Sequence, residues 1–127
     1  MTLVDTDVMV WYMRGNSRAA GVLRRLDRFA VSAVTYMELL QGMRNKEEAR
    51  LLRATFKTWN VPILAINEEI SGKAVSYVEQ YFHGHSLRLA DALIGATATV
   101  NGLPLLTGNQ KHYRVLPDLV LRRFRPG

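Results

Sequence analysis

The feature that most constrains this sequence is the alternation of short apolar runs with longer segments of helical periodicity. Five runs have the length and composition of buried strands, at residues 2–5, 29–32, 61–66, 104–107 and 119–124. Apolar residues recur every three or four positions in the segments between them, at residues 18–28, 33–43, 46–60, 68–82 and 86–102. This alternation predicts an α/β fold, a three-layer α/β/α sandwich with a mostly parallel sheet of four or five strands.

Length and composition predict one domain that spans residues 1–127, since 48% of the chain is hydrophobic and no repeat or linker divides it. No window approaches the roughly 20 apolar residues of a membrane span, and acidic residues near the start do not fit a signal peptide. We therefore expect a soluble, cytoplasmic protein with no membrane partner. The absence of cysteine excludes disulfides, thiolate nucleophiles and zinc–thiolate sites.

The chain is basic, with 17 Lys and Arg against 11 Asp and Glu and a formal net charge of +6. Thirteen of the 17 are arginine, whose forked guanidinium suits phosphate and carboxylate. The charge is compatible with a nucleic acid or an acidic partner, and equally with an ordinary solvated surface.

Three acidic residues occupy positions that are otherwise apolar. Asp5 ends the first predicted strand, Glu38 lies in the helix entered from the second strand, and Asp91 has apolar neighbours on every side of its helix. Each one alone is compatible with a helix cap, a salt bridge or a solvent-facing position, and Arg88 is a candidate partner for Asp91. The three acids together predict a shared metal site. An ionised carboxylate is costly to bury without a compensating charge, so we expect the three buried carboxylates to converge and hold Mg²⁺ or Mn²⁺.

Polar residues after the fourth predicted strand supply another wall of the expected site. Thr107 and Asn109 carry oxygen atoms that can hold a metal or its waters, and His112 follows three positions later, in reach of a substrate phosphate or on the surface. A divalent ion at such a site activates a water and neutralises the charge that develops on a phosphodiester, while arginines hold the nucleic-acid backbone.

In this order, the motifs resemble a PIN domain (PilT N-terminus), specifically a small toxin ribonuclease of the VapC type. The resemblance covers nearly the whole chain and rests on four segments, LVDTDV, TYMELLQG, LADALIGATA and LLTGNQKHY. It implies a metal-dependent endoribonuclease in which a metal-activated water attacks the phosphorus, leaving a 5′-phosphate and a 3′-hydroxyl. Carried over by position, it implies that Asp5, Glu38 and Asp91 are the catalytic residues and bind Mg²⁺ or Mn²⁺. Thr107, Asn109 and Asp7 are the implied supporting residues.

One position departs from the family pattern. Many relatives carry a further acid at the place of Asn109 or of His112, and neither residue is acidic here. The number of metal ions is therefore open. Arg88 and His112 are candidates for substrate binding.

The resemblance also implies two protein partners, a small VapB-like antitoxin that blocks the acidic site and a second copy of the chain in a homodimer. Five residues are compatible with a groove for a partner helix and, more readily, with ordinary core: Trp11, Tyr12, Met13, Val22 and Leu26.

Two other functions remain open at this level. A haloacid-dehalogenase-like phosphatase would use Asp5 as nucleophile and Asp7 as general acid, but the late acidic pair of such enzymes is missing and Glu38 stays unexplained. The other alternative is a PIN-like RNA-binding module that has lost turnover.

Overall fold

A single parallel sheet organises the computed structural model, which describes all residues, 1–127. Its strands lie in the order β3-β2-β1-β4-β5, and every neighbouring pair is parallel. Their bounds are β1 Thr2–Val4, β2 Phe29–Ser32, β3 Ile63–Leu64, β4 Leu105–Thr107 and β5 Leu121–Arg123. The prediction of a parallel α/β sheet is confirmed, and the strands are shorter than the apolar runs that contain them.

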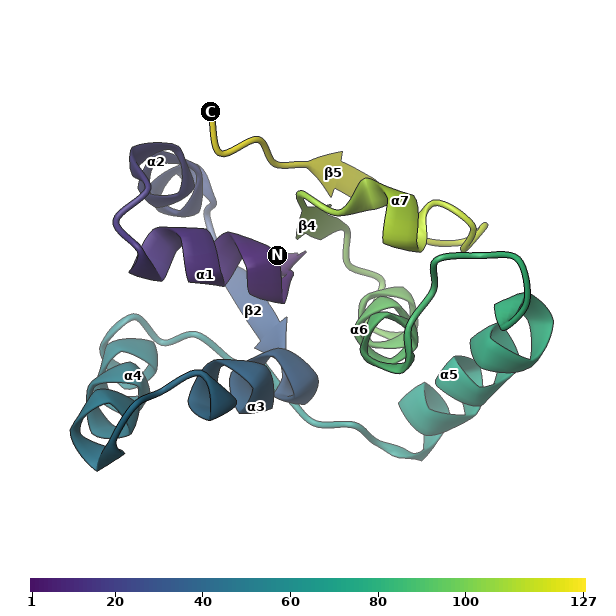
Figure 1. Cartoon of the computed structure of the whole chain (residues 1–127), viewed down its shortest axis with the longest axis horizontal. Helices are drawn as coiled ribbons and strands as arrows, with labels where there is room; N and C mark the ends of the chain where they lie inside the picture. The colour runs from purple at the N-terminus through teal and green to yellow at the C-terminus, as the bar shows by residue number, and fades with distance from the viewer.

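Seven helices surround the sheet (Figure 1). They are α1 Thr6–Met13, α2 Ser17–Arg25, α3 Ala33–Gln41, α4 Lys46–Thr58, α5 Glu68–Tyr81, α6 Leu89–Val100 and α7 Gln110–Tyr113. The side chains of Ser32 and Asn67 accept hydrogen bonds from the first turns of α3 and α5, as N-caps do. None of the helices is long and apolar enough to cross a membrane.

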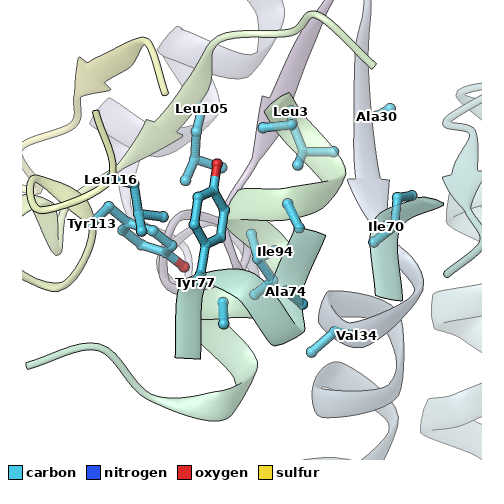
Figure 2. Close-up of a cluster of buried hydrophobic side chains, with 13 residues drawn as sticks. Leu3, Ala30, Val34, Ile70, Ala74, Tyr77, Ile94, Leu105, Tyr113 and Leu116 are labelled. Carbon is cyan, nitrogen blue, oxygen red and sulfur yellow. The ribbon is translucent and has the colours of Figure 1, made fainter. Parts of the chain in front are cut away.

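Successive strand residues point to opposite faces of the sheet, which produces two separate cores. Leu3, Ala30 and Leu105 belong to a core that α5 and α6 cover, and Figure 2 shows Leu3 and Leu105 close to Ile94 and Tyr77 of those helices. The next residue of each strand, Val4, Val31 and Leu106, belongs to the opposite core, which α1, α2 and α4 cover. The predicted three-layer arrangement is therefore confirmed.

The strand register determines which residues meet at the carboxyl edge of the sheet. Val4 of β1 pairs with Leu106 of β4, so the residues that follow, Asp5 and Thr107, emerge side by side. Ser32 ends the neighbouring strand β2 and starts α3 at the same edge. Chain segments that are about 100 residues apart in sequence are thus joined at one place.

Candidate metal-binding site

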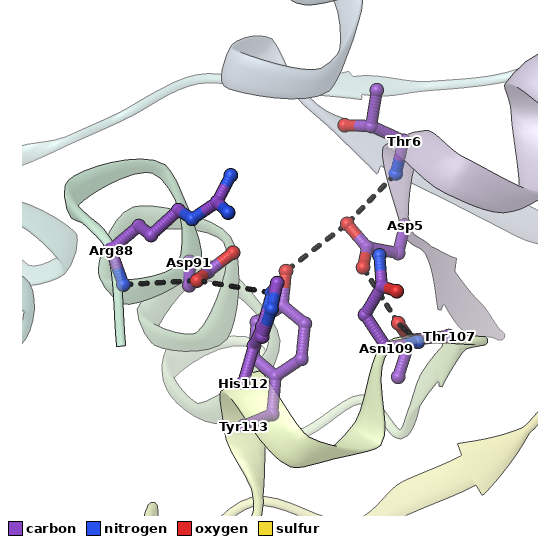
Figure 3. A network of polar contacts seen from close by, with 8 residues as sticks. All are labelled: Asp5, Thr6, Arg88, Asp91, Thr107, Asn109, His112 and Tyr113. Carbon is purple, nitrogen blue, oxygen red and sulfur yellow. Dashed lines mark hydrogen bonds and ion pairs between the residues drawn. The ribbon is translucent and has the colours of Figure 1, made fainter. Parts of the chain in front are cut away.

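Asp5 is the centre of the polar cluster at the carboxyl edge of the sheet (Figure 3). Its side chain is 4% exposed and accepts three hydrogen bonds. Thr6 N donates to Oδ1 at 2.8 Å, the Tyr113 hydroxyl to Oδ1 at 3.1 Å, and the Thr107 hydroxyl to Oδ2 at 2.7 Å. Asp5 is also the N-cap of α1, where the helix dipole favours negative charge. The carboxylate is consequently held in one orientation from three sides.

The ionised form of Asp5 is nevertheless disfavoured in the metal-free protein. Burial, followed by the charge of nearby Asp7, raises the pKa of Asp5 to about 7, although its hydrogen bonds work in the opposite direction. Burial also raises the pKa of Tyr113, and the charges of Asp5, Asp91 and Asp7 raise it further, so Tyr113 remains a neutral donor. No lysine or arginine pairs with Asp5. The site thus has a negative charge for which the chain supplies no cation.

Asp91 lies in the first turn of α6 and is 8% exposed, which confirms that this carboxylate is buried. Its Oδ2 accepts a hydrogen bond from Arg88 N at 2.9 Å and lies 3.6 Å from His112 Nδ1 (Figure 3). Arg88, the candidate partner of Asp91, forms no ion pair with it. The backbone amide of Arg88 donates to this carboxylate, and the Arg88 side chain is exposed. His112 is not a surface histidine, since only 15% of its side chain is exposed.

Glu38 is exposed, so the prediction that it is buried was wrong. Helix α3 buries Val34, Thr35 and Leu39; Glu38 lies one turn after Val34 and Thr35 on the same face of the helix, but its side chain is exposed to solvent. The Thr6 hydroxyl lies 2.7 Å from Glu38 Oε1 and 2.9 Å from Thr35 Oγ1. Because that hydroxyl has one hydrogen, it donates to the carboxylate and accepts from Thr35. Glu38 therefore joins the cluster from its solvent side through Thr6, the neighbour of Asp5.

The loop after β4 supplies the residues that the sequence placed beside the acids. Thr107 is fully buried; its hydroxyl donates to Asp5 and accepts a hydrogen bond from Asn109 N at 3.0 Å. The Asn109 side chain makes no hydrogen bond within the chain and is exposed. Its amide oxygen is thus free to bind an incoming group.

Asp7 anchors this loop to α1. Its Oδ2 accepts a hydrogen bond from Gly108 N at 2.9 Å, whereas its Oδ1 is buried without a partner. Burial raises the pKa of Asp7. A Cβ atom on Gly108 would lie 2.6 Å from Asp7 Oδ2, so this close contact requires glycine. A carboxylate bound to a backbone amide in this way is not a free general acid, and the arrangement does not support the phosphatase alternative.

The chemistry of the cluster fits a hard divalent ion. All candidate ligands are oxygen atoms, and a cation would compensate both the buried Asp5 carboxylate and the unpartnered Asp7 Oδ1. No three acidic or histidine side chains are close enough to form a complete metal cage by themselves. The expected convergence of Asp5, Glu38 and Asp91 into one direct set of three ligands is thus not seen in this structure. Mg²⁺ sites commonly use one or two carboxylates, with water or phosphate completing the coordination.

Two residues of the cluster were missed by sequence reasoning, Thr6 and Tyr113. Each lies next to a residue that was singled out, and neither breaks an apolar pattern as a carboxylate does. Tyr113 reaches Asp5 only because the short helix α7 turns the chain back after β4. The hydrogen-bonding role of both hydroxyls was therefore visible only in the folded chain.

Comparisons with known proteins show the family of this chain. The PIN domain family model matches residues 2–116. Ribonuclease VapC19 of Mycobacterium tuberculosis is 34% identical over 126 residues, covering 94% of this chain and 97% of that protein. Ribonuclease VapC10 of the same organism is 34% identical over 125 residues, covering 94% and 90%.

Among solved structures, a toxin–antitoxin complex from Klebsiella pneumoniae contains a chain with a TM-score of 0.81 and 27% identity. The match covers 100% of this chain and 98% of that one. With a buried Asp5 and Asp91 at the carboxyl edge of a parallel sheet, and relatives that match along nearly its whole length, this chain belongs to the PIN domain family.

Proposed function

We propose that this protein is a metal-dependent endoribonuclease and the toxin of a type II toxin–antitoxin pair. The observation that carries the proposal is the buried Asp5 carboxylate, which has no cationic partner and shares its sheet edge with Asp91 and Glu38. The matches to the relatives named ribonucleases cover 94% of the chain. The proposed unit of function is the whole of residues 1–127.

In this proposal Asp5, Asp91 and Glu38 hold Mg²⁺ or Mn²⁺. When bound, a divalent ion supplies the Lewis acidity that lowers the pKa of a water and balances the charge on a phosphodiester. The chain contributes preorganisation, because hydroxyl and amide donors hold the Asp5 carboxylate before any ligand arrives. Asn109 offers a neutral amide oxygen, whereas a carboxylate at this position would bind a second metal ion more strongly. We therefore propose that the site holds one ion tightly and a second ion only weakly.

His112 and Arg88 are the proposed substrate contacts. His112 lies beside Asp91, and Arg88 is an exposed residue that leads into α6 next to the same carboxylate. Both side chains present nitrogen donors at the rim of the acidic cluster. A phosphate entering the site meets these donors before it meets the carboxylates.

The proposed protein partner is a VapB-type antitoxin that lies along α1. Trp11 and Met13 are 37% and 42% exposed, so they are not the core residues that the sequence favoured, whereas Tyr12 is half-buried. A hollow of about 780 Å³ between α1, α3 and α4 is lined mainly by apolar residues, and its charged lining residues are Arg14, Glu38, Arg44 and Glu48. A peptide in this hollow would reach the acidic cluster, in keeping with the toxin–antitoxin complex that contains a similar chain. Homodimerisation stays a prediction from the resemblance.

The test is cleavage of a structured RNA such as tRNA by purified, antitoxin-free protein with Mg²⁺, with Mn²⁺ and with EDTA. We expect discrete cuts that require metal and disappear in Asp91→Asn. Asp118→Asn is the matched control, because Asp118 is an acid outside the site that pairs with Lys73 at 2.6 Å. The control is expected to cleave at the rate of the unmodified protein.

Two outcomes would contradict the proposal. Cleavage by Asp91→Asn at the unmodified rate would remove Asp91 from the site. RNA binding by the folded protein without cleavage under any metal would favour the binding-module alternative, and Asn109→Asp would then test whether an added acid restores turnover.

A further inference from the structure

An arginine-lined groove lies on the side of the molecule where the C-terminal segment crosses α2. Five arginines line a hollow of about 510 Å³ that no acidic side chain lines: Arg18, Arg24, Arg25, Arg123 and Arg125. We refer to it as the arginine groove. Figure 1 shows its two walls, α2 and the chain that runs from β5 to the C-terminus.

The wall from α2 follows from helical spacing. Arg18, Gly21 and Arg25 lie at positions i, i+3 and i+7, which places them on one face of the helix. Gly21 is buried and has no side chain to fill this face. The Arg25 guanidinium covers it, with Nη1 3.4 Å from the position that a Cβ on Gly21 would occupy.

The opposite wall is held in place, although its sequence has the composition of a flexible tail. Phe124 N donates to Thr107 O at 2.9 Å, and the Phe124 side chain is buried in the core beneath α1 and α2. The Asn16 side-chain amide donates to Pro126 O at 3.0 Å. Arg123 and Arg125 flank Phe124 and are therefore fixed opposite α2, about 100 residues away in sequence.

The charge of the groove is not compensated within the chain. The ion pairs of the protein involve other residues, and all five arginines are exposed. Bringing five like charges together opposes folding, so the fold itself does not require this cluster. A polyanion would bind this cluster favourably, because it neutralises the arginines and releases counterions.

The arginine groove adjoins the acidic cluster. Thr107 donates to Asp5 through its hydroxyl and accepts from Phe124 through its carbonyl oxygen, so one residue links the two sites. Gly108 contacts both, since its Cβ position lies 2.6 Å from Asp7 Oδ2 and 3.3 Å from Phe124 O. A strand of nucleic acid that leaves the carboxylates along this edge of the sheet enters the groove.

We propose that the arginine groove binds the phosphate backbone of the RNA substrate beyond the cut bond and determines how strongly long RNA is held. This inference rests on the proposed ribonuclease function. The guanidinium groups bind phosphates of successive nucleotides and make no sequence-specific contacts with the bases. A dinucleotide that fills only the acidic cluster does not reach the groove.

The test measures binding of a labelled single-stranded RNA in EDTA, where the proposed cleavage does not occur. Each phosphate contact contributes about 0.7 to the slope of log K against log salt, or about fivefold in affinity between 1 M and 0.1 M salt. For the Arg18→Gln/Arg25→Gln variant, the slope of log K against log salt should be smaller in magnitude by about 1.4. Its affinity for RNA at 0.1 M salt should be about 25-fold lower. The matched control is Arg53→Gln/Lys57→Gln on the exposed side of α4, for which no change is expected.

A second variant keeps the test valid if changes in α2 disturb folding. Arg123→Gln/Arg125→Gln alters the other wall of the groove and leaves Phe124 in place. The salt dependence of its RNA affinity is expected to fall by a similar amount. With Mg²⁺ or Mn²⁺ present, both variants should raise KM for long RNA, leave kcat unchanged and cleave a dinucleotide like the unmodified protein. A purely structural role would instead lower the melting temperature and affect both substrates alike.

Three outcomes separate this inference from the proposed function. If both groove variants bind RNA like the control, the groove is not an RNA site, even if the unmodified protein cleaves. If they keep RNA affinity but bind the antitoxin more weakly, the groove belongs to a protein partner and the inference fails. If groove-dependent RNA binding occurs without cleavage under any metal, the inference holds and the ribonuclease proposal fails.

Discussion

Replacing Asp5 by Asn is expected to stabilise the metal-free protein while it abolishes cleavage. Asn has the same shape, and its Oδ1 still accepts from Thr6 N and from the Tyr113 hydroxyl. Its Nδ2 replaces Oδ2 and donates to the Thr107 hydroxyl oxygen, as the protonated carboxyl group would. What it removes is a buried charge that no cation balances. Sites that place charge for function commonly lose stability in this way.

The magnitude follows from the proton equilibrium of Asp5. Its pKa is raised from 3.8 to about 7 on folding, so the folded state holds this proton more tightly than the unfolded chain. The stabilisation is fully present below about pH 3.8 and is lost as the pH rises to about 7. At about 1.4 kcal/mol per pH unit, ionised Asp5 costs the folded state about 4 kcal/mol at pH 8.

The assay is urea unfolding followed by circular dichroism, in EDTA, between pH 4 and pH 8. Asp5→Asn should exceed the unmodified protein in free energy of unfolding by up to about 4 kcal/mol at pH 8 and by almost nothing at pH 4. Asp118→Asn is the control, for which the free energy of unfolding should fall instead of rise. Lys73 lowers the pKa of Asp118, and the variant loses this exposed ion pair, at a cost of at most about 1 kcal/mol.

Addition of Mn²⁺ should narrow the gap between Asp5→Asn and the unmodified protein, since only the latter binds the ion at Asp5; an ion at 100 times its Kd stabilises by about 2.7 kcal/mol. Equal stability of the two proteins at pH 8 in EDTA, or lower stability of Asp5→Asn, would refute the argument that Asp5 is an uncompensated buried charge.

Two further predictions concern the surroundings of Asp5. Tyr113→Phe removes one hydrogen-bond donor to Asp5, so the pKa of Asp5 should rise further. In a metal titration at pH 7, about tenfold more metal should be needed for half-maximal cleavage. An unchanged midpoint would show that the Tyr113 hydroxyl does not affect metal binding. Gly108→Ala places a Cβ 2.6 Å from Asp7 Oδ2, so thermal unfolding should show a loss of about 1–3 kcal/mol and cleavage should slow, whereas Gly72→Ala, in open space on α5, should add about 0.5–1 kcal/mol. Equal effects of the two alanines would contradict the close contact at Gly108.

Local sequence patterns were enough to predict the sheet and most helices. A strand such as Leu3–Val4 is buried on both faces and is therefore continuously apolar, while α2 and α4 carry arginines and lysines on one side only. Helix α1 was not predicted, because its sequence has no polar stripe: even its exposed residues Trp11 and Met13 are apolar. Helix α7 was missed since a four-residue helix has too few positions to show a period.

The acidic site was only partly readable from the sequence. Asp5 and Asp91 were predicted to be buried because their neighbours are apolar, and both are. The same reasoning was wrong for Glu38, which is exposed although Val34 and Thr35, one turn earlier on the same face of α3, are buried. Neighbours in sequence report the average environment of a helix, whereas the burial of one side chain depends on what the fold packs against that position.

The sequence by itself determined the α/β class, a mostly parallel sheet of four or five strands and the two buried carboxylates, because each depends on local periodicity or on a charge inside an apolar run. Tertiary structure alone decided that Tyr113 reaches Asp5, that Asp7 anchors Gly108, and that arginines from both ends of the chain line one groove. These contacts join residues about 100 positions apart, and the parallel register of β1, β4 and β5 brings them together. No local pattern encodes that register.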